Sequence, residues 1–484
     1  MKPVLRNVLI ALALGLLVII GIGAWLWSGN PTDRLVAAST GAQPQLVEPE
    51  AERFPTLGLA KPVGWQRGEA PVAPAGLQVN RFADRLNHPR TMLALPNGDV
   101  LVTETNRPPA RGAGLTGWVM GLLFKQVGAG EPSPNRLVLL RDANGDGVAE
   151  QRHVLRTAGL ASPSGLAYAN GKLYVANHDA VLAFNYKLGD TAVSGAPTRI
   201  MPLPAGGNHW MRNLQLSGDG KLLYVAVGSA SNIGEHGMAS EKGRAMIWEV
   251  TLATGRSRPY GSGLRNPNGM DWNSATGELW TVVQERDQLG GDLVPDYLTN
   301  VPIGAQYGWP WVYWKDKEDD RVMEPMPDFL TEYTRKPEYA LGAHTAALGL
   351  RFAAAGNRLG PLFTNGAFVA RHGSWNRKPL SGYDIIFVTF DANGNPRGMP
   401  VTVLSGFLRD QRHARGRPTW LEFDKTGALL VSDDTAGIIW RVIDPKAAPS
   451  AAIKPVETES MPPQQELSDD PEAAYLRPEG FKDP

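Results

Sequence analysis

His209 is the residue of this chain best placed for acid–base chemistry. It stands in the stretch GNHWMRN at residues 207–213, directly before alternating apolar residues that predict a short strand. A side chain in such a loop can reach a central cleft, and a neutral imidazole with an ordinary pKa of about 6.5 can accept a proton near neutral pH. The alternative interpretation is a structural histidine that is hydrogen-bonded beside Trp210.

Arginines and amides occupy corresponding positions later in the chain. Arg265 and Asn266 open a later strand pair, and Arg415 and Arg417 come directly before the last one. In an extended segment, the side chains of Arg415 and Arg417 point to the same face. Arginines that face one channel repel one another unless an anion lies between them, and guanidinium groups often bind carboxylates in a bidentate manner. The pattern therefore indicates a ligand with carboxylates; the alternative for each arginine is an ion pair at the surface or at a strand edge.

A separate acidic loop has the residue types of a calcium site. Asp142, Asn144 and Asp146 offer oxygen ligands at alternate positions, and a glycine and Glu150 follow. This order is similar to the start of an EF-hand loop, although Glu150 comes earlier than in that loop and no flanking helices are evident. The alternative is a plain turn between two strands. Calcium bound here would be structural, because the loop is distant in the chain from the histidine and the arginines.

One sequence pattern recurs along the chain, and it predicts how these residues are positioned. It consists of a small or proline-containing opening, an alternating strand, a glycine turn and a second strand. Six copies, each with room for two further strands, predict an all-β fold, a six-bladed β-propeller with loops around the end of a central channel. Two separate β-sandwiches would not explain a repeat that spans the chain. The copies lie at residues 88–103, 162–176, 207–229, 266–283, 347–370 and 417–432.

The composition of the 484-residue chain limits its partners and its chemistry. The 48 basic and 48 acidic residues give a formal net charge of zero, so no nucleic-acid partner is expected. The 54 glycines and 39 prolines suit many short strands joined by turns. Because cysteine is absent, the chain has no disulfide, thiolate metal site, cysteine nucleophile or Cys-x-x-Cys-His haem motif.

The two ends of the chain differ from the repeats. Residues 8–27 carry no charge and follow Lys2 and Arg6, which predicts an N-terminal transmembrane helix that holds the rest on the periplasmic side of the inner membrane. Export by a cleaved signal peptide is the alternative. The predicted organisation is an anchor or signal at 1–28, a linker and arm at 29–78, the propeller at 79–444 and a disordered tail at 445–484.

Six motifs, taken in order, resemble the glucose/sorbosone dehydrogenase family. They are HWMRN at 209–213, GLRNP at 263–267, QER at 284–286, YGWP at 307–310, HGSWNR at 372–377 and RGRP at 415–418. The resemblance extends over about residues 79–443. The family consists of quinoproteins, soluble aldose dehydrogenases and L-sorbosone dehydrogenases among them, that bind pyrroloquinoline quinone (PQQ) on a six-bladed propeller. The resemblance implies PQQ-dependent oxidation of an aldose sugar or a related aldehyde or alcohol.

The resemblance also implies roles for individual residues. His209 corresponds to the base that takes the proton of the substrate hydroxyl while hydride passes to the quinone. Arg265 corresponds to the arginine that stabilises charge on the quinone oxygen. The backbone carbonyls of Asp287 and Gln288 correspond to those that hold calcium against PQQ. Cofactor ligands are expected at Asn266, Arg286, Arg377, Lys378, Arg415 and Arg417.

The sequence departs from the family at two places. Arg286 stands where the soluble glucose enzymes have glutamine, and Ser229 stands where the family has an aspartate. Electrons would pass to a separate acceptor, a quinone or a cytochrome, because the chain has no haem motif. Two other functions remain open at this point. One is a metal-dependent lactonase-type hydrolase, which would need carboxylate and asparagine ligands around the channel, and the other is a non-catalytic binding module.

Overall fold

The computed structural model describes residues 29–109, 121, 126–128 and 130–456. Strands dominate this part of the chain and its helices are short, so the all-β prediction is confirmed. The predicted membrane segment at residues 8–27 lies outside the described residues. Within them, no helix combines the length and the apolar character needed to cross a membrane.

Six sheets of four or five strands make up most of the described chain, and each repeat supplies two strands of one sheet. The first sheet contains β4 (Pro89–Ala94), β5 (Val100–Glu104), β6 (Arg136–Arg141) and β7 (Gln151–Arg156). The second contains β8 (Gly165–Ala169), β9 (Lys172–Ala176), β10 (Ala180–Asn185) and β11 (Thr198–Pro202). The third contains β12 (Arg212–Leu216), β13 (Leu222–Val227), β14 (Met246–Thr251), β15 (Ser257–Ser262) and the short β19 (Ala305–Gln306).

The other three sheets continue the same order along the chain. The fourth contains β16 (Asn266–Trp272), β17 (Leu279–Gln284), β18 (Pro295–Asn300), β22 (Tyr339–Ala343) and β1 (Thr40–Gly41). The fifth contains β23 (Ala347–Phe352), β24 (Gly366–Arg371), β25 (Asp384–Phe390) and β26 (Pro396–Leu404). The sixth contains β29 (Pro418–Phe423), β30 (Leu429–Asp433), β31 (Ile438–Ile443) and β3 (Gln78–Ala83).

Short elements complete the described fold. They are the strands β2 (Lys61–Pro62), β20 (Val312–Tyr313), β21 (Lys317–Glu318), β27 (Leu408–Asp410) and β28 (His413–Ala414), the 3-10 helices η1 (Val36–Ser39), η2 (Met238–Glu241) and η3 (Pro361–Phe363), and the α-helix α3 (Leu330–Tyr333).

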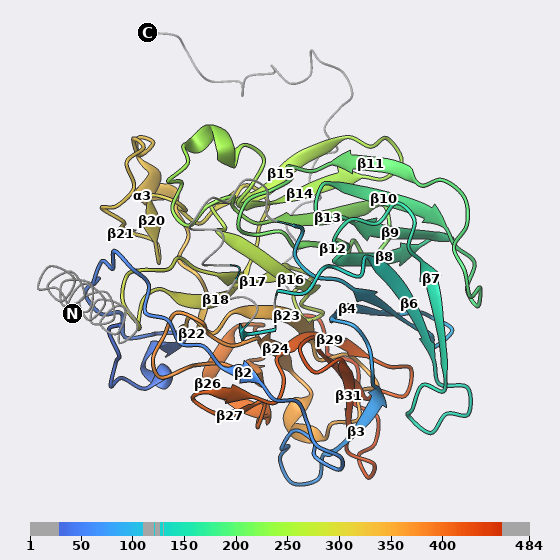
Figure 1. The fold of residues 1–484 in the computed structure, drawn as a ribbon. Helices are drawn as coiled ribbons and strands as arrows, with labels where there is room; N and C mark the ends of the chain where they lie inside the picture. Colours follow the sequence, from blue (N-terminus) through green and yellow to red (C-terminus); the bar gives the residue numbers. More distant parts are fainter. Residues whose placement is uncertain (1–28, 110–120, 122–125, 129, 457–484) are drawn as a thin grey trace, which may run out of the picture.

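The six sheets form a closed ring, with β4, β8, β12, β16, β23 and β29 innermost (Figure 1). Each innermost strand contacts the innermost strands of both neighbouring sheets, and β29 contacts β4. Buried apolar side chains fill the space between each adjacent pair of sheets. Between the fourth and fifth sheets, for example, Trp280 packs with Phe352 and Phe390. The ring is held together because each sheet removes the apolar face of its neighbour from water.

A strand from the N-terminal side closes the ring. β3 pairs antiparallel with β31, so the sixth sheet combines three C-terminal strands with one that precedes the first repeat. Val79 lies opposite Val442 in this pairing, and Trp440 of β31 is wholly buried. Backbone hydrogen bonds therefore join the two ends of the ring, in addition to side-chain packing between the first and sixth sheets.

Strand register places particular loops at one end of the ring, called the site face below. In each sheet, the start of the innermost strand lies opposite the end of the second strand. The loop that precedes the innermost strand and the loop that follows the second strand therefore lie at the same end of the ring. The pairs that define this end include Arg212–Val227, Asn266–Gln284, Ala347–Arg371 and Pro418–Asp433.

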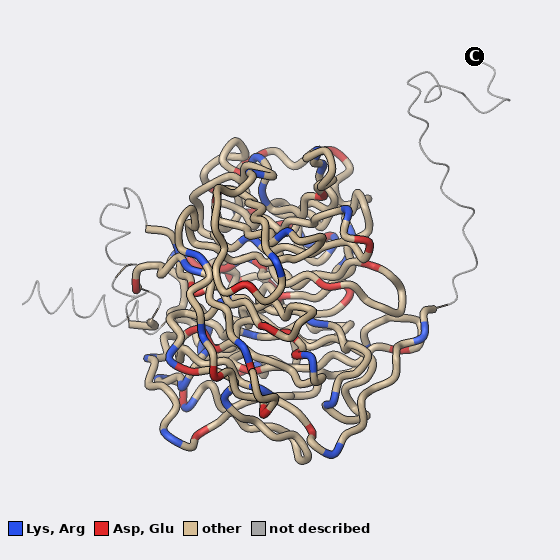
Figure 2. Tube along the Cα trace, turned by 90° about the vertical axis from the view of Figure 1, so that its right-hand side faces the viewer, with Lys and Arg blue, Asp and Glu red and all other residues tan. Residues whose placement is uncertain are grey.

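Segments outside the repeats pack on the ring. In the predicted linker and arm, β1 pairs with β22 and β2 runs parallel to β28. At the C-terminal end, the Val456 amide donates to the Ala275 carbonyl at 2.7 Å, and residues 457–484 lie outside the described part. Acidic and basic residues are interspersed along the trace (Figure 2), in keeping with the balanced net charge.

Candidate active site

His209 lies on the site face with one ring nitrogen anchored and the other open. Its Nδ1 is 2.9 Å from both the carbonyl oxygen and the hydroxyl of Ser229. A carbonyl oxygen accepts hydrogen bonds only, so Nδ1 carries the hydrogen and donates it. In the neutral ring, the lone pair is therefore on Nε2, which has no hydrogen-bond partner among the described residues. This is the tautomer that a base needs.

Burial keeps the His209 ring neutral. It is the largest cause that lowers the pKa of His209 to about 3, and the positive charge of Arg265 lowers it further. The hydrogen bond to Ser229 and the charge of Asp287 act in the opposite direction but are weaker. The charge of Arg265 therefore favours the unprotonated form of His209, and burial favours that form more strongly.

We therefore expect His209 to remain unprotonated in the cofactor-free protein well below the ordinary histidine range. A lowered pKa means that the neutral form persists as the pH falls, until the pH approaches about 3. The imidazole proton signals of His209, assigned by their loss in His209→Ala, should show no titration between pH 8 and about 5. A midpoint near the ordinary value of about 6.5 would contradict this environment.

Asp287 is the electrostatic centre of the loop that follows β17. Its Oδ1 accepts a hydrogen bond from Asn376 Nδ2 at 2.6 Å and lies 3.5 Å from His344 Nδ1. Its Oδ2 accepts one from Arg265 Nη2 at 3.2 Å. Burial raises the pKa of Asp287, but the hydrogen bond from His344 and the charge of Arg265 outweigh it and lower the pKa to about 2. The carboxylate is therefore ionised throughout the physiological range.

His344 was not predicted as a site residue. Its Nε2 lies 3.0 Å from the Gly290 carbonyl and its Nδ1 faces Asp287, so both nitrogens donate and the ring is an imidazolium. Burial lowers the pKa of His344, but the hydrogen bond and charge of Asp287 outweigh it and the pKa is raised. A sequence signal for this residue exists: His344 stands three positions before Ala347, as His209 stands three before Arg212.

Arg265 is buried, and its guanidinium is saturated by the protein. Nε donates to the Asn232 carbonyl at 3.0 Å, and Nη1 to the carbonyls of Glu285 at 2.6 Å and Gln284 at 3.4 Å. Nη2 donates to Asn232 Oδ1 at 2.8 Å and to Asp287. In this arrangement Arg265 positions the 284–287 loop and acts on His209 through its charge. Its predicted contact with the quinone oxygen remains a prediction.

Three of the other predicted cofactor ligands already donate hydrogen bonds within the protein. Arg286 is wholly buried and donates to the carbonyls of Pro310 at 2.7 Å and Val312 at 2.8 Å. Arg377 is almost wholly buried and donates to the carbonyls of Gly291 and Arg34, each at 2.8 Å. Both arginines tie loops and the N-terminal arm to the ring, so neither offers an accessible donor where it stands. Asn266 Nδ2 likewise donates to Gln284 Oε1 at 3.0 Å.

Arg417 is a predicted ligand whose side chain is held by backbone carbonyls. It donates to the carbonyls of His372 at 3.1 Å and Gly373 at 2.5 Å, and it has no carboxylate partner among the described residues. Arg415, in contrast, lies 3.4 Å from Glu69 and stacks over Trp65 of the arm. Lys378 is half-buried, which lowers its pKa.

A second charged group adjoins Arg417. Asp434 forms an ion pair with Arg90, and His372 Nε2 lies 3.1 Å from both Asp434 oxygens. Burial, followed by the charge of Arg417, lowers the pKa of His372 to about 4. The Arg90 guanidinium stacks 5.6 Å over the ring of Trp210, the neighbour of His209. The arginine and histidine motifs of the first, third, fifth and sixth repeats thus meet on the site face.

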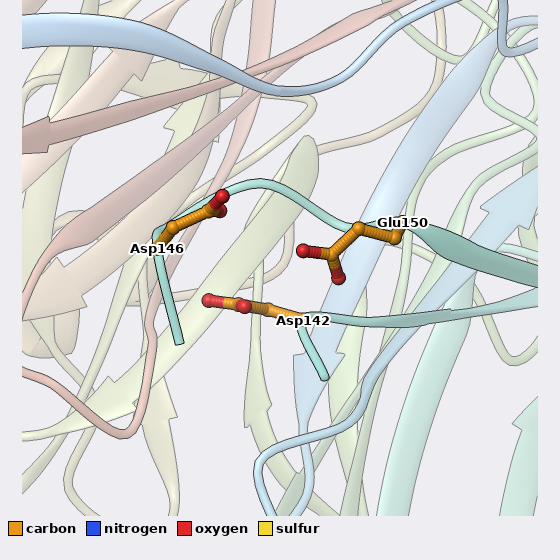
Figure 3. Close-up of side chains that lie close together, drawn as sticks. All are labelled: Asp142, Asp146 and Glu150. Atoms are coloured by element: carbon orange, nitrogen blue, oxygen red, sulfur yellow. The ribbon is translucent and has the colours of Figure 1, made fainter. Parts of the chain in front are cut away.

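The acidic loop lies away from this site. Figure 3 shows the carboxylates of Asp142, Asp146 and Glu150 turned toward one another between β6 and β7, with oxygens within 4.8 Å. Asp142 accepts hydrogen bonds from the amides of Gly145 at 2.6 Å and Gly147 at 2.9 Å, and Asn144 accepts one from the Asp146 amide at 2.8 Å. These contacts stabilise the turn itself, and calcium here remains a prediction. Register places the loop at the opposite end of the first sheet from the site face.

The predicted cofactor calcium has a competitor. Arg321 Nη1 lies 3.0 Å from the carbonyl oxygen of Asp287 and 2.7 Å from that of Gln288. These are the two oxygens that the resemblance assigns to calcium, and each already accepts a hydrogen bond from a cation. The residues present therefore do not fit a calcium ion at this position.

Comparisons with known proteins agree with this geometry. A relative from Coprinopsis cinerea, named pyrroloquinoline quinone-dependent pyranose dehydrogenase, is 25% identical over 438 residues, covering 77% of this chain and 55% of the relative. The chain thus spans just over half the length of that protein. An uncharacterised protein from Borreliella burgdorferi is 26% identical over 294 residues, covering 58% of this chain and 76% of that protein.

Structural and family comparisons extend this result. The solved PQQ domain of the Coprinopsis cinerea pyranose dehydrogenase matches with a TM-score of 0.61 and 20% identity, covering 80% of this chain and 100% of that domain, which shows a shared fold. The pyranose dehydrogenase is of the class that the sequence resemblance predicted. A family model described as TrAA12-like matches residues 135–301 and 328–446. Because these segments make up more than half of its residues, the chain belongs to the TrAA12-like family.

Proposed function

We propose that this protein is a PQQ-dependent dehydrogenase that oxidises a hydroxyl of an aldose sugar, or a related alcohol or aldehyde, at the end of a six-bladed propeller. The observation that carries the proposal is His209, whose anchored Nδ1 leaves an unprotonated Nε2 open on the site face. The six-sheet ring and the names of the relatives support the fold and the cofactor. The proposed reaction requires a base and a group that binds the carboxylates of the cofactor, and His209 and Arg417 supply them.

The residues on the site face fit a ligand with several carboxylates. PQQ carries three carboxylates and an ortho-quinone. Arg417 retains N–H groups that no described residue accepts, and guanidinium groups bind carboxylates strongly. Lys378 and Arg415 supply further positive charge in half-buried positions. We expect these three residues to hold the cofactor.

The chain's own residues then perform the proton chemistry. Bound PQQ supplies the two-electron acceptor for the hydrogen that leaves the substrate carbon with its electron pair. His209 Nε2 accepts the hydroxyl proton at the same time, so the alcohol carbon becomes a carbonyl carbon. Ser229 holds the ring through Nδ1, and Asp287 stabilises the positive charge that His209 gains. Burial, with the charge of Arg265 as the smaller effect, keeps the ring neutral before the substrate binds.

The proposal is tested with purified protein, PQQ and a panel of sugars. Binding should quench tryptophan fluorescence, and a sugar substrate should bleach the quinone absorbance with formation of the oxidised sugar. Binding without oxidation of any aldose, alcohol or aldehyde would favour the non-catalytic binding module instead. The hydrolase alternative is not favoured, because the group of three carboxylates in the described chain lies in the 142–150 loop and not on the site face. The electron acceptor, a quinone or cytochrome, and export with an N-terminal membrane anchor remain part of the proposal.

Arg417 should contribute more to PQQ binding than Arg415. Arg417→Gln is expected to cost about 1.5–3 kcal/mol of binding free energy, because it removes hydrogen bonds from a charged group. Arg415→Gln should have a smaller effect, because that guanidinium already pairs with Glu69. Calorimetric titration with PQQ measures both, and Arg397→Gln on β26, which removes an exposed arginine, is the control. Equal affinities for all three variants would contradict the assignment.

A further inference from the structure

Arg321 is held firmly at the two carbonyls that follow β17. Its Nε and Nη2 form a bidentate pair with Asp319, at 2.8 Å to Oδ1 and 2.7 Å to Oδ2. The Asp319 side chain is wholly buried and also lies 3.4 Å from Arg286 Nη1. Burial raises the pKa of Asp319, but the hydrogen bond from Arg321 and the charge of Arg286 outweigh it and lower the pKa. An ionised, buried carboxylate therefore holds Nε and Nη2 of Arg321, while Nη1 donates to the carbonyl oxygens of Asp287 and Gln288.

A calcium ion at the same carbonyls would have to displace this arrangement. Calcium binds six to eight oxygens at about 2.3–2.6 Å. The Asp287 carbonyl already accepts hydrogen bonds from Arg321 and, at 3.1 Å, from Asn232 Nδ2. A divalent cation would also stand beside a guanidinium of like charge, whose departure would leave Asp319 with one cationic partner fewer. The guanidinium instead satisfies both carbonyls with a single positive group.

The segment that supplies Arg321 is distinct from the family pattern. The TrAA12-like family model matches residues up to 301 and resumes at 328, so Arg321 falls in the unmatched stretch between them. This stretch is ordered by its own contacts: the Asp319 amide donates to the Trp311 carbonyl at 2.8 Å, and Trp311 Nε1 donates to the Glu324 carbonyl at 3.0 Å. The side chain of Arg321 is 20% exposed, so it is partly accessible to solvent.

We propose that the Arg321 guanidinium takes the place of the cofactor calcium ion, so that this protein binds PQQ without a divalent cation. The proposal rests on the proposed PQQ-dependent function and adds to it the identity of the cation. Arg321 supplies fixed positive charge and hydrogen-bond donors at the carbonyl pair of Asp287 and Gln288.

The decisive experiment compares PQQ binding with and without calcium. Metal-free protein is titrated with PQQ in EGTA and in excess calcium, with tryptophan fluorescence and calorimetry as readouts. The parent protein should bind PQQ with the same affinity, within about 2-fold, in both buffers. Arg321→Gln should bind about 10- to 100-fold more weakly in EGTA, because charge-assisted hydrogen bonds are lost, and calcium should restore part of the affinity. Arg397→Gln, which removes an arginine from an exposed pair with Asp391, should behave as the parent.

Two results would overturn the proposal. One is a loss of PQQ affinity of 10-fold or more when calcium is removed from the parent protein. The other is an Arg321→Gln variant that binds PQQ in EGTA as tightly as the parent, with a thermal melting curve that shows it to be folded. The substitutions Asp142→Asn and Asp146→Asn are added to each protein, so that calcium bound at the acidic loop does not affect the comparison of PQQ affinities.

Failure of the proposed function gives a different result. If no variant binds PQQ in either buffer, the PQQ-dependent function fails, and a titration with calcium alone still tests the role of Arg321. The protein with Asp142→Asn and Asp146→Asn should then take up no calcium. One equivalent of bound calcium in that protein would contradict the view that Arg321 excludes the ion.

Discussion

Replacing His209 with alanine should lower turnover by about 10²- to 10⁴-fold, the usual contribution of a general base. Without a base, the substrate carbon would lose its hydrogen while the hydroxyl proton has no acceptor. The structure supplies the acceptor at Nε2 and fixes the ring through Ser229. Because the side chain makes no hydrogen bond to a predicted cofactor ligand, PQQ affinity should stay near that of the parent.

Stopped-flow bleaching of the quinone by sugar under saturating conditions measures this step. His413→Ala, a half-buried histidine on β28 that pairs with Asp410, is a matched control and should keep the parental rate. Near-parental turnover of His209→Ala with PQQ bound would remove His209 from the mechanism. Loss of both PQQ binding and the folded state would instead assign it a structural role.

Replacing Asp287 with alanine should lower the free energy of unfolding by about 3–5 kcal/mol, the range for removing one partner of a buried ion pair. The substitution leaves His344 and Arg265 facing each other with no carboxylate between them. It also removes the acceptor for Asn376 Nδ2. Urea denaturation at pH 7 measures the change, and Asp219→Ala in the exposed turn after β12 should produce no resolvable change.

The pH dependence of this effect follows from the lowered pKa of Asp287, about 2 in the folded protein. A carboxyl with a lowered folded-state pKa stabilises the protein above its unfolded value, about 3.9, and this contribution is lost as the pH falls toward the folded value. The contribution of the ionised Asp287 should therefore be lost below about pH 4, so the difference between parent and Asp287→Ala should shrink there. A difference that still grows as the pH falls below about 4 would contradict an ionised Asp287.

The sequence alone predicted the local elements and the position of His209 directly before a strand. Alternating apolar residues and glycine turns act within about 20 residues, so each repeat and its strand pair were predictable. The position of His209 before an innermost strand was equally local, since the register of β12 with β13 places it near Ser229. His344 could have been found by the same rule, because it stands at the same distance before β23.

Only the tertiary structure decided how the arginines are used. An arginine in a loop pairs with whichever carboxylate or carbonyl lies nearest in space, and those partners come from distant parts of the chain. Arg377 therefore holds the arm at Arg34, while Arg417 retains free donors on the site face. In the same way, β3 closes the ring on β31, and Arg321 reaches the carbonyls that the resemblance assigned to calcium. The Arg321 contacts span 33 and 34 positions and the Arg377 contact spans 343. Residue type and local spacing do not encode such contacts.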